Sequence, residues 1–199
     1  MRRPCRKLFI NSCFRLLMTG YAVLFFSSAN AQSLNKNWKT ELEQALTDYK
    51  KCKNETGDNP QKCSNVTGEV LKIVYNLNDF YSSQRSRYMV AKEIAEFLED
   101  NTEWQLLGHA YEQDALEKAQ ELANTKRAVV AVLPDKGDAG HVSVILPGEL
   151  ASSGTWGFKV PNSTSFFVHD PQNSYVGKAL SYAFTRNMIK DVLLFARSY

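Results

Sequence analysis

Cys63 is the residue of this chain whose type and position best suit a nucleophile. It follows Asn59 and Pro60, which fit the cap and the first position of a helix because Asn can accept from an unpaired amide and Pro has no N–H. Apolar residues then recur at helical spacing, namely Val66, Val70, Ile73, Val74 and Leu77. We therefore expect Cys63 in the first turn of a helix, where partial positive charge favours the thiolate.

His141 is the best of the three histidines as a base for that thiolate. It follows a glycine turn and opens the apolar segment 141–146, which has the composition of a β-strand. Alternation along a strand would point Val142 to the core and His141 the other way, an orientation that could present the ring to the end of the cysteine helix. His109 and His169 lie in turn-like contexts, where capping or surface roles are more usual.

A Cys–His pair also needs a polar group that orients the imidazole ring. Asn162 follows the His141 segment at a suitable distance along the chain, and we favour it for this position. Asp170 is the stronger acceptor, but it precedes a proline in a turn-like context. Both could instead be turn residues that bond to their own backbone, so the third position stays open. We expect the backbone N–H of Cys63 to be one donor to the oxyanion.

Residues 1–31 have the pattern of a cleaved export signal. They combine five basic residues, an apolar stretch too short to span a bilayer comfortably, and an Ala-x-Ala cleavage site at residues 29–31. We expect a secreted or periplasmic protein with no integral membrane segment after cleavage. The signal holds five of the 24 basic residues and none of the 21 acidic ones, which leaves 19 basic residues and a net charge of −2. The basic balance of the whole sequence is therefore no argument for nucleic acid as a partner.

A disulfide is the simplest alternative to a catalytic thiol. After removal of the signal only Cys52 and Cys63 remain, and two cysteines in an exported chain can close a loop. The protein would then be a non-enzymatic secreted binding protein in which His141 is structural.

The order of the expected elements indicates an α+β domain. We expect helices over residues 34–52, 60–77, 88–100 and 112–123, and strands over residues 128–133, 141–146, 156–161, 165–168 and 191–197. Residues 107–110 suggest a turn, and residues 179–184 are ambiguous. Because the helices precede the strands, the cysteine helix should pack on an antiparallel sheet. We divide the chain into the signal at 1–31, a helical extension at 32–58 and one domain at 59–199.

Three stretches resemble the papain-like peptidoglycan amidases, the NlpC-type and CHAP cell-wall peptidases. They are Cys63-Ser64 at the expected helix start, Gly140-His141-Val142 at the strand entry, and the terminal segment 192–197. The resemblance extends from about residue 59 to the C-terminus. The chain departs from the family at Lys62, where members often have a small polar or acidic residue, and it has no match to the upstream oxyanion glutamine of papain-type enzymes.

The resemblance implies a papain-like fold with N-terminal helices on an antiparallel sheet. It also implies a hydrolase that cleaves amide bonds of peptidoglycan stem peptides or cross-links without metal or cofactor. Carried over to this sequence, Cys63 is the nucleophile, His141 the base and Asn162 the orienting residue. The expected partners are the peptidoglycan peptide and, as an open option, a protein inhibitor of the site. Acyl transfer to an amine, as in transglutaminases, uses the same pair and stays a further option.

Overall fold

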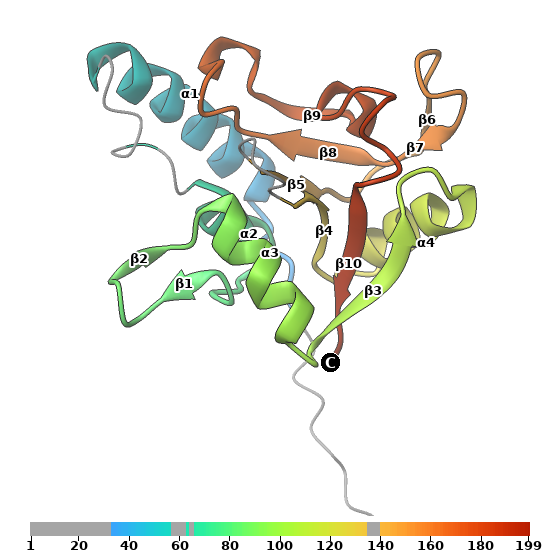
Figure 1. Ribbon diagram of the computed structural model, residues 1–199. Coiled ribbons are helices and arrows are strands. Elements are labelled where there is room, and N and C mark those ends of the chain that lie inside the picture. Colours follow the sequence, from blue (N-terminus) through green and yellow to red (C-terminus); the bar gives the residue numbers. More distant parts are fainter. Residues whose placement is uncertain (1–32, 57–62, 64–65, 135–139) are drawn as a thin grey trace, which may run out of the picture.

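An antiparallel sheet of six strands forms the centre of the fold (Figure 1). The computed structural model describes residues 33–56, 63, 66–134 and 140–199. In spatial order the strands are β3 (Trp104–His109), β10 (Leu193–Arg197), β4 (Val129–Leu133), β5 (His141–Ile145), β8 (Asn162–Ser165) and β9 (Tyr175–Ala179). Each neighbouring pair is antiparallel. The predicted α+β class with an antiparallel sheet is therefore confirmed.

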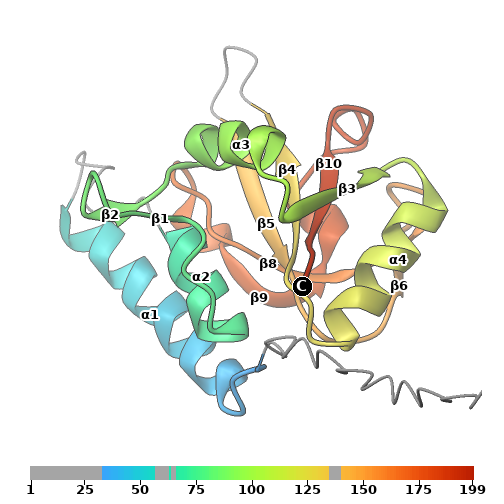
Figure 2. The same cartoon turned by 90° about the horizontal axis from the view of Figure 1, so that it is seen from below.

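The described helices cover both faces of this sheet. They are α1 (Trp38–Thr56), α2 (Val66–Tyr75), α3 (Ala91–Asp100) and α4 (Gln113–Asn124). Figure 2 shows α1, α2 and α3 on one side of the sheet and α4 on the other. The smaller elements are the hairpins β1 (Tyr81–Ser82) with β2 (Arg87–Tyr88) and β6 (Ala151–Ser152) with β7 (Lys159–Val160), and the 3-10 turns η2 (Pro171–Asn173) and η3 (Leu180–Tyr182).

Two hydrophobic cores lie on the two faces of the sheet because side chains alternate along each strand. Val142 and Val144 of β5 pack in the same core as the buried residues of α1, α2 and α3. Ile145 belongs to the second core, which α4 closes. The alternation predicted for residues 141–146 is thus confirmed.

The helix α2 is tied directly to β5. Its buried residues Val70, Leu71 and Val74 lie in the first core, and the hydroxyl of Tyr75 donates to the backbone oxygen of Ile145 at 2.7 Å. Burial raises the pKa of Tyr75, so the phenol stays neutral and keeps this proton.

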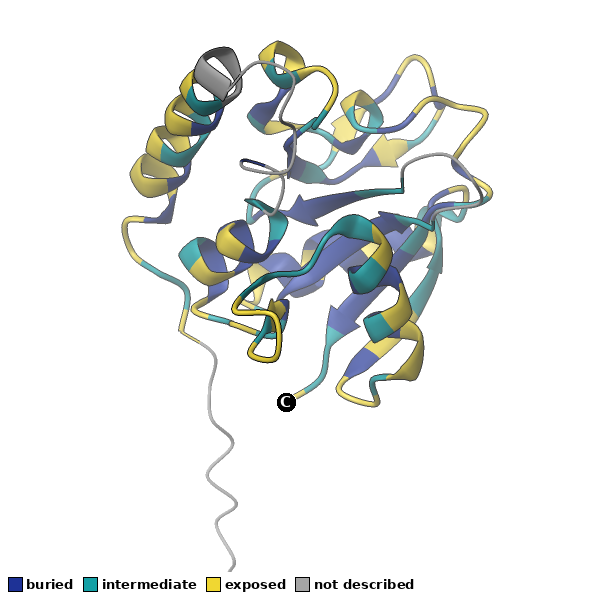
Figure 3. Ribbon diagram, turned by 60° about the vertical axis from the view of Figure 1, so that its left-hand side comes forward, coloured by how far each residue is buried: buried dark blue, intermediate teal, exposed yellow. Residues whose placement is uncertain are grey.

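The first helix, α1, packs along α2 and shares its core (Figure 3). Trp38, Leu42 and Tyr49 form its buried stripe, while the opposite face is exposed. Within the described residues no helix has both the length and the apolar character needed to cross a bilayer.

Several sequence predictions differ from the structure. Residues 107–110 are not a turn, because Leu107, Gly108 and His109 belong to the edge strand β3. The strand β9 was not predicted, and Asn162 lies in β8 instead of a loop. The expected helix cap at Asn59 and Pro60 and the expected signal at residues 1–31 lie outside the described residues.

Candidate functional site

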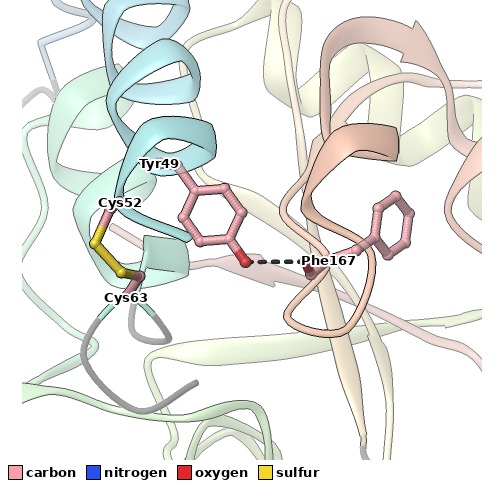
Figure 4. Close-up of a disulfide and its surroundings, with 4 residues drawn as sticks. All are labelled: Tyr49, Cys52, Cys63 and Phe167. Atoms are coloured by element: carbon pink, nitrogen blue, oxygen red, sulfur yellow. Dashed lines mark hydrogen bonds between the residues drawn. A yellow bond between two sulfur atoms is a disulfide. The ribbon is translucent and has the colours of Figure 1, made fainter. Parts of the chain in front are cut away.

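The sulfur atoms of Cys52 and Cys63 form a disulfide (Figure 4). Their Cα atoms lie 6.4 Å apart, and the bond joins the last turns of α1 to the chain just before α2. Neither sulfur is a thiol in this structure. The described part of α2 begins at Val66, and Cys63 itself lies in a 3-10 turn three positions ahead of it.

The disulfide forms part of a groove of about 310 Å³ between α1, α2 and β2. The lining residues are Ala45, Asp48, Tyr49, Cys52, Cys63, Val66, Glu69 and Tyr88. Tyr88 can lie against α2 because position 68 is glycine, where any Cβ would collide with the tyrosine ring. Burial, and then the charge of Glu69, raise the pKa of Tyr88, which keeps the phenol neutral. The groove therefore combines an apolar floor with carboxylates on two walls.

The ring of His141 is held on the face of the sheet opposite α2. It stacks on Phe167 with the ring centres 4.8 Å apart and meets Phe184 edge-on at 5.4 Å. Phe184 belongs to the second core, whereas Cys63 belongs to the first. The structure therefore does not bring the sulfur of Cys63 against the imidazole. The expectation that alternation would turn the ring towards the cysteine helix is wrong, because α2 packs on the face that carries Val142.

A chain of hydroxyl groups fixes the proton on the imidazole of His141. Ser143 donates to the backbone oxygen of Thr164 at 2.9 Å, and Ser165 donates to Ser143 at 2.9 Å. Since each hydroxyl has one proton, the 3.2 Å contact between Nε2 of His141 and Ser165 requires the ring to donate. Nε2 therefore carries the hydrogen, and Nδ1 is the nitrogen that can accept a proton.

Burial lowers the pKa of His141 to about 4. The cause is desolvation, which penalises the charged imidazolium. The ring is accordingly neutral at neutral pH and can accept a proton, but with a pKa of about 4 it is a weak base there.

The structure places Asn162 away from the ring of His141. Its backbone oxygen accepts from the N–H of Leu146 and its Nδ2 donates to Pro147 at 3.1 Å, which places it beside the far end of β5. Leu146 lies five steps along the chain from His141, or roughly 16 Å at the usual rise of a strand. The side chain instead anchors the turn that follows β5.

Asp170 and His169 both have exposed side chains beyond β8. The carboxylate of Asp170 accepts from Nδ2 of Asn173 across the turn η2, which is the local turn role that its sequence context allowed. Ser165 is the described residue whose side chain hydrogen-bonds to the ring, and the sequence did not predict it. The available signal was the polar run of residues 162–165, in which Ser163, Thr164 and Ser165 are buried.

The remaining histidine, His109, lies in β3 and stacks on Tyr111. Its Nδ1 is buried and has no hydrogen-bond partner among the described residues. Within the described ranges no three His, Cys, Asp or Glu side chains are grouped closely enough to hold a metal ion.

No protein-family model matches this chain, and no curated protein matches it. The likeness to the papain-like amidases therefore consists of the sequence motifs described above.

Proposed function

We propose that this protein is a papain-like cysteine hydrolase that cleaves amide bonds in peptidoglycan stem peptides or cross-links. Cys63 is the nucleophile, in its reduced form, and the structure corresponds to a latent, oxidised form. The single observation that carries the proposal is that Tyr49 connects the groove of the disulfide to the residue stacked on His141. Tyr49, which lines the groove with the disulfide, donates to the backbone oxygen of Phe167 at 2.9 Å, and the ring of Phe167 stacks on His141. The groove that holds Cys63 and the ring of His141 are thus joined through two residues, Tyr49 and Phe167.

The state of His141 also supports this proposal. Its Nε2–H is held by Ser165, which leaves Nδ1 to accept the thiol proton of Cys63. Ser165 takes the orienting position that the sequence motif suggested for Asn162. Catalysis requires two changes from the described form: reduction of the disulfide, and approach of the Cys63 sulfur to Nδ1 round the end of the sheet.

The reaction follows from these roles. The thiolate of Cys63 attacks the amide carbonyl carbon, and His141 gives its acquired proton to the leaving amine. Water then attacks the thioester with the same imidazole as base, and the thiol is regenerated. Backbone N–H groups beside Cys63 would stabilise the oxyanion.

The test uses the mature protein and three variants with purified peptidoglycan, with mass analysis of the released fragments. Cys52→Ser leaves Cys63 as a thiol without added reductant, so it should release peptides, as should the reduced wild type. Cys63→Ser should release none, and His141→Gln should be slower by about 100-fold or more. Circular dichroism shows whether each variant is folded. If folded Cys52→Ser and the reduced wild type release nothing beyond the Cys63→Ser control, the hydrolase proposal is wrong.

A non-enzymatic secreted binding protein is the second candidate. The observation that favours it is the disulfide itself, together with the placement of the His141 ring on the opposite face of the sheet. In that case the groove between α1 and α2 is the binding site, and the disulfide braces its walls. In that case Cys63→Ser should have the same affinity for peptidoglycan as the wild type, and neither protein should cleave it.

A further inference from the structure

We propose that the Cys52–Cys63 disulfide is a site of thiol exchange, at which an external thiol attacks the sulfur of Cys52 and expels Cys63 as the thiolate. The preferred reductant is a neutral or cationic thiol. This inference rests on the proposed function, because the exchange would release the Cys63 thiolate that the hydrolase needs. Its chemistry can be tested in the oxidised protein without any substrate.

Access favours attack at Cys52. The residue Cys63 is only 7 % exposed, whereas Cys52 is half-buried where α1 packs against the first core. Both line the open groove between α1 and α2. A thiol that enters the groove can therefore reach the sulfur of Cys52 more readily than that of Cys63.

The helix ends favour departure of Cys63. The residue Cys52 lies near the C-terminal end of α1, where unpaired carbonyl groups destabilise a thiolate. Cys63 lies three positions before the described start of α2, on the side where the positive end of the helix dipole favours a thiolate. The better-stabilised thiolate is the faster leaving group in thiol exchange. Access and leaving-group stability thus select the same sulfur for attack.

The charge of the groove selects the reductant. The carboxylate of Asp48 on α1 and that of Glu69 on α2 line opposite walls. Asp48 accepts from Nε2 of Gln44, and among the described residues no Lys or Arg forms an ion pair with either carboxylate. An anionic thiol that approaches the disulfide is repelled by both charges, and a cationic one is attracted.

The exchange balances as a two-electron reduction. The reductant's thiolate forms a bond to the sulfur of Cys52 as the bond between Cys52 and Cys63 breaks, and the electron pair leaves on Cys63. A second thiol of the reductant then attacks the mixed disulfide. The products are the thiol of Cys52, the thiolate of Cys63 and the reductant as a disulfide.

The first experiment maps the mixed disulfide. Oxidised full-length mature protein is exposed briefly to 2-mercaptoethanol, a neutral single thiol, then alkylated with iodoacetamide, digested and analysed by mass spectrometry. We expect mercaptoethanol on Cys52 and the alkyl group on Cys63, in at least tenfold excess over the reverse pattern. Equal amounts of the two patterns, or an excess of the reverse, would overturn the inference.

The second experiment tests the charge selection. Rates of disulfide opening, each expressed per thiolate, are compared for cysteamine, which is cationic, and 3-mercaptopropionate, which is anionic. At low ionic strength the ratio of the cysteamine rate to the 3-mercaptopropionate rate should be about fivefold higher in the wild type than in Asp48→Asn/Glu69→Gln. In 0.5 M salt the two proteins should give the same ratio. Glu117→Gln, an exposed carboxylate on α4, is the matched control and should leave the ratio unchanged. A ratio that the double variant does not alter contradicts the selection of the reductant.

The outcomes separate this inference from the hydrolase proposal. An adduct on Cys52 without cleavage of peptidoglycan by Cys52→Ser supports thiol exchange and rejects the hydrolase. A disulfide that reacts only when the protein is unfolded in urea rejects thiol exchange, while Cys52→Ser still tests the hydrolase.

Discussion

Tyr49 and Phe167 are joined by a hydrogen bond of 2.9 Å although they lie 118 positions apart in the sequence. The phenol of Tyr49 comes from the disulfide-bearing helix α1, and the carbonyl that accepts it belongs to the residue stacked on His141. This bond is the direct link between the two halves of the candidate site. Burial raises the pKa of Tyr49 to about 12, so the phenol keeps its proton across the physiological range.

Tyr49→Phe should therefore lower the free energy of unfolding by about 0.5–1.5 kcal/mol, the usual net value of one such bond. Urea denaturation measures the change. Tyr81→Phe is the matched control, because the Tyr81 side chain is 43 % exposed, and it should be neutral within about 0.5 kcal/mol. Equal effects of the two substitutions would show that the bond to Phe167 contributes nothing measurable.

Opening the disulfide should destabilise the protein without unfolding it. The bridge closes a loop with a sequence separation of 11, for which the chain-entropy relation gives about 3 kcal/mol. We expect that loss for Cys52→Ser/Cys63→Ser relative to the oxidised wild type. The reduced wild type should match the double variant, and a larger loss in reduced protein would indicate repulsion between the two thiols.

Stability should fall with acid between about pH 6.5 and pH 4 because of His141. Its folded pKa is about 4, whereas the ordinary imidazole value is about 6.5. In that interval the unfolded chain binds a proton that the folded protein does not. The free energy of unfolding therefore falls by up to about 1.4 kcal/mol for each pH unit of acidification. Above this window both states are neutral and the histidine contributes no slope.

Chemical denaturation at a series of pH values measures this dependence. His141→Gln should flatten the profile through the window, since glutamine does not titrate. The acid slope of the variant must be smaller than that of the wild type; an unchanged slope would assign the effect to other groups.

Ser165→Ala should affect both stability and the state of the His141 ring. The substitution removes the acceptor for Nε2–H and leaves Ser143 without its donor, in a buried site where an unpaired group costs about 1–3 kcal/mol. Nitrogen NMR of the wild type should report the tautomer with hydrogen on Nε2. The variant should populate the other tautomer, and an unaltered spectrum would mean that Ser165 does not orient the ring.

Asn162→Ala should act on stability alone. The lost bond from Nδ2 to Pro147 corresponds to about 0.5–1.5 kcal/mol. In the peptidoglycan assay its rate should equal that of wild type, whereas Ser165→Ala should be slower. The reverse order would restore Asn162 as the orienting residue and refute the assignment drawn from the hydroxyl chain.

Much of the local structure follows from the sequence. The stripes of apolar residues that predicted helices at residues 34–52 and 112–123 correspond to α1 and α4, because one face of each helix meets a core. The β-branched run at residues 128–133 and the alternating run at 141–146 became β4 and β5. The edge strand β3 was missed because Gly108 and the exposed Leu106 interrupt its pattern.

The state of Cys52 and Cys63 could not be predicted from the sequence. Composition and spacing allowed either a thiol or a bridge at Cys63, because both need only two cysteines near each other in the chain. The structure joins them because α1 folds back along α2 and brings the Cα atoms to 6.4 Å.

The sequence by itself determined the α+β class, the strand that begins at His141 and the alternation that separates His141 from Val142. Only the tertiary structure decided which of those two faces meets α2. The alternation of side chains looks the same from either face of a sheet, so the packing of distant elements selects between them. The same packing placed Ser165 beside the ring and Asn162 at the far end of β5, since cross-strand register depends on pairing and not on distance along the chain.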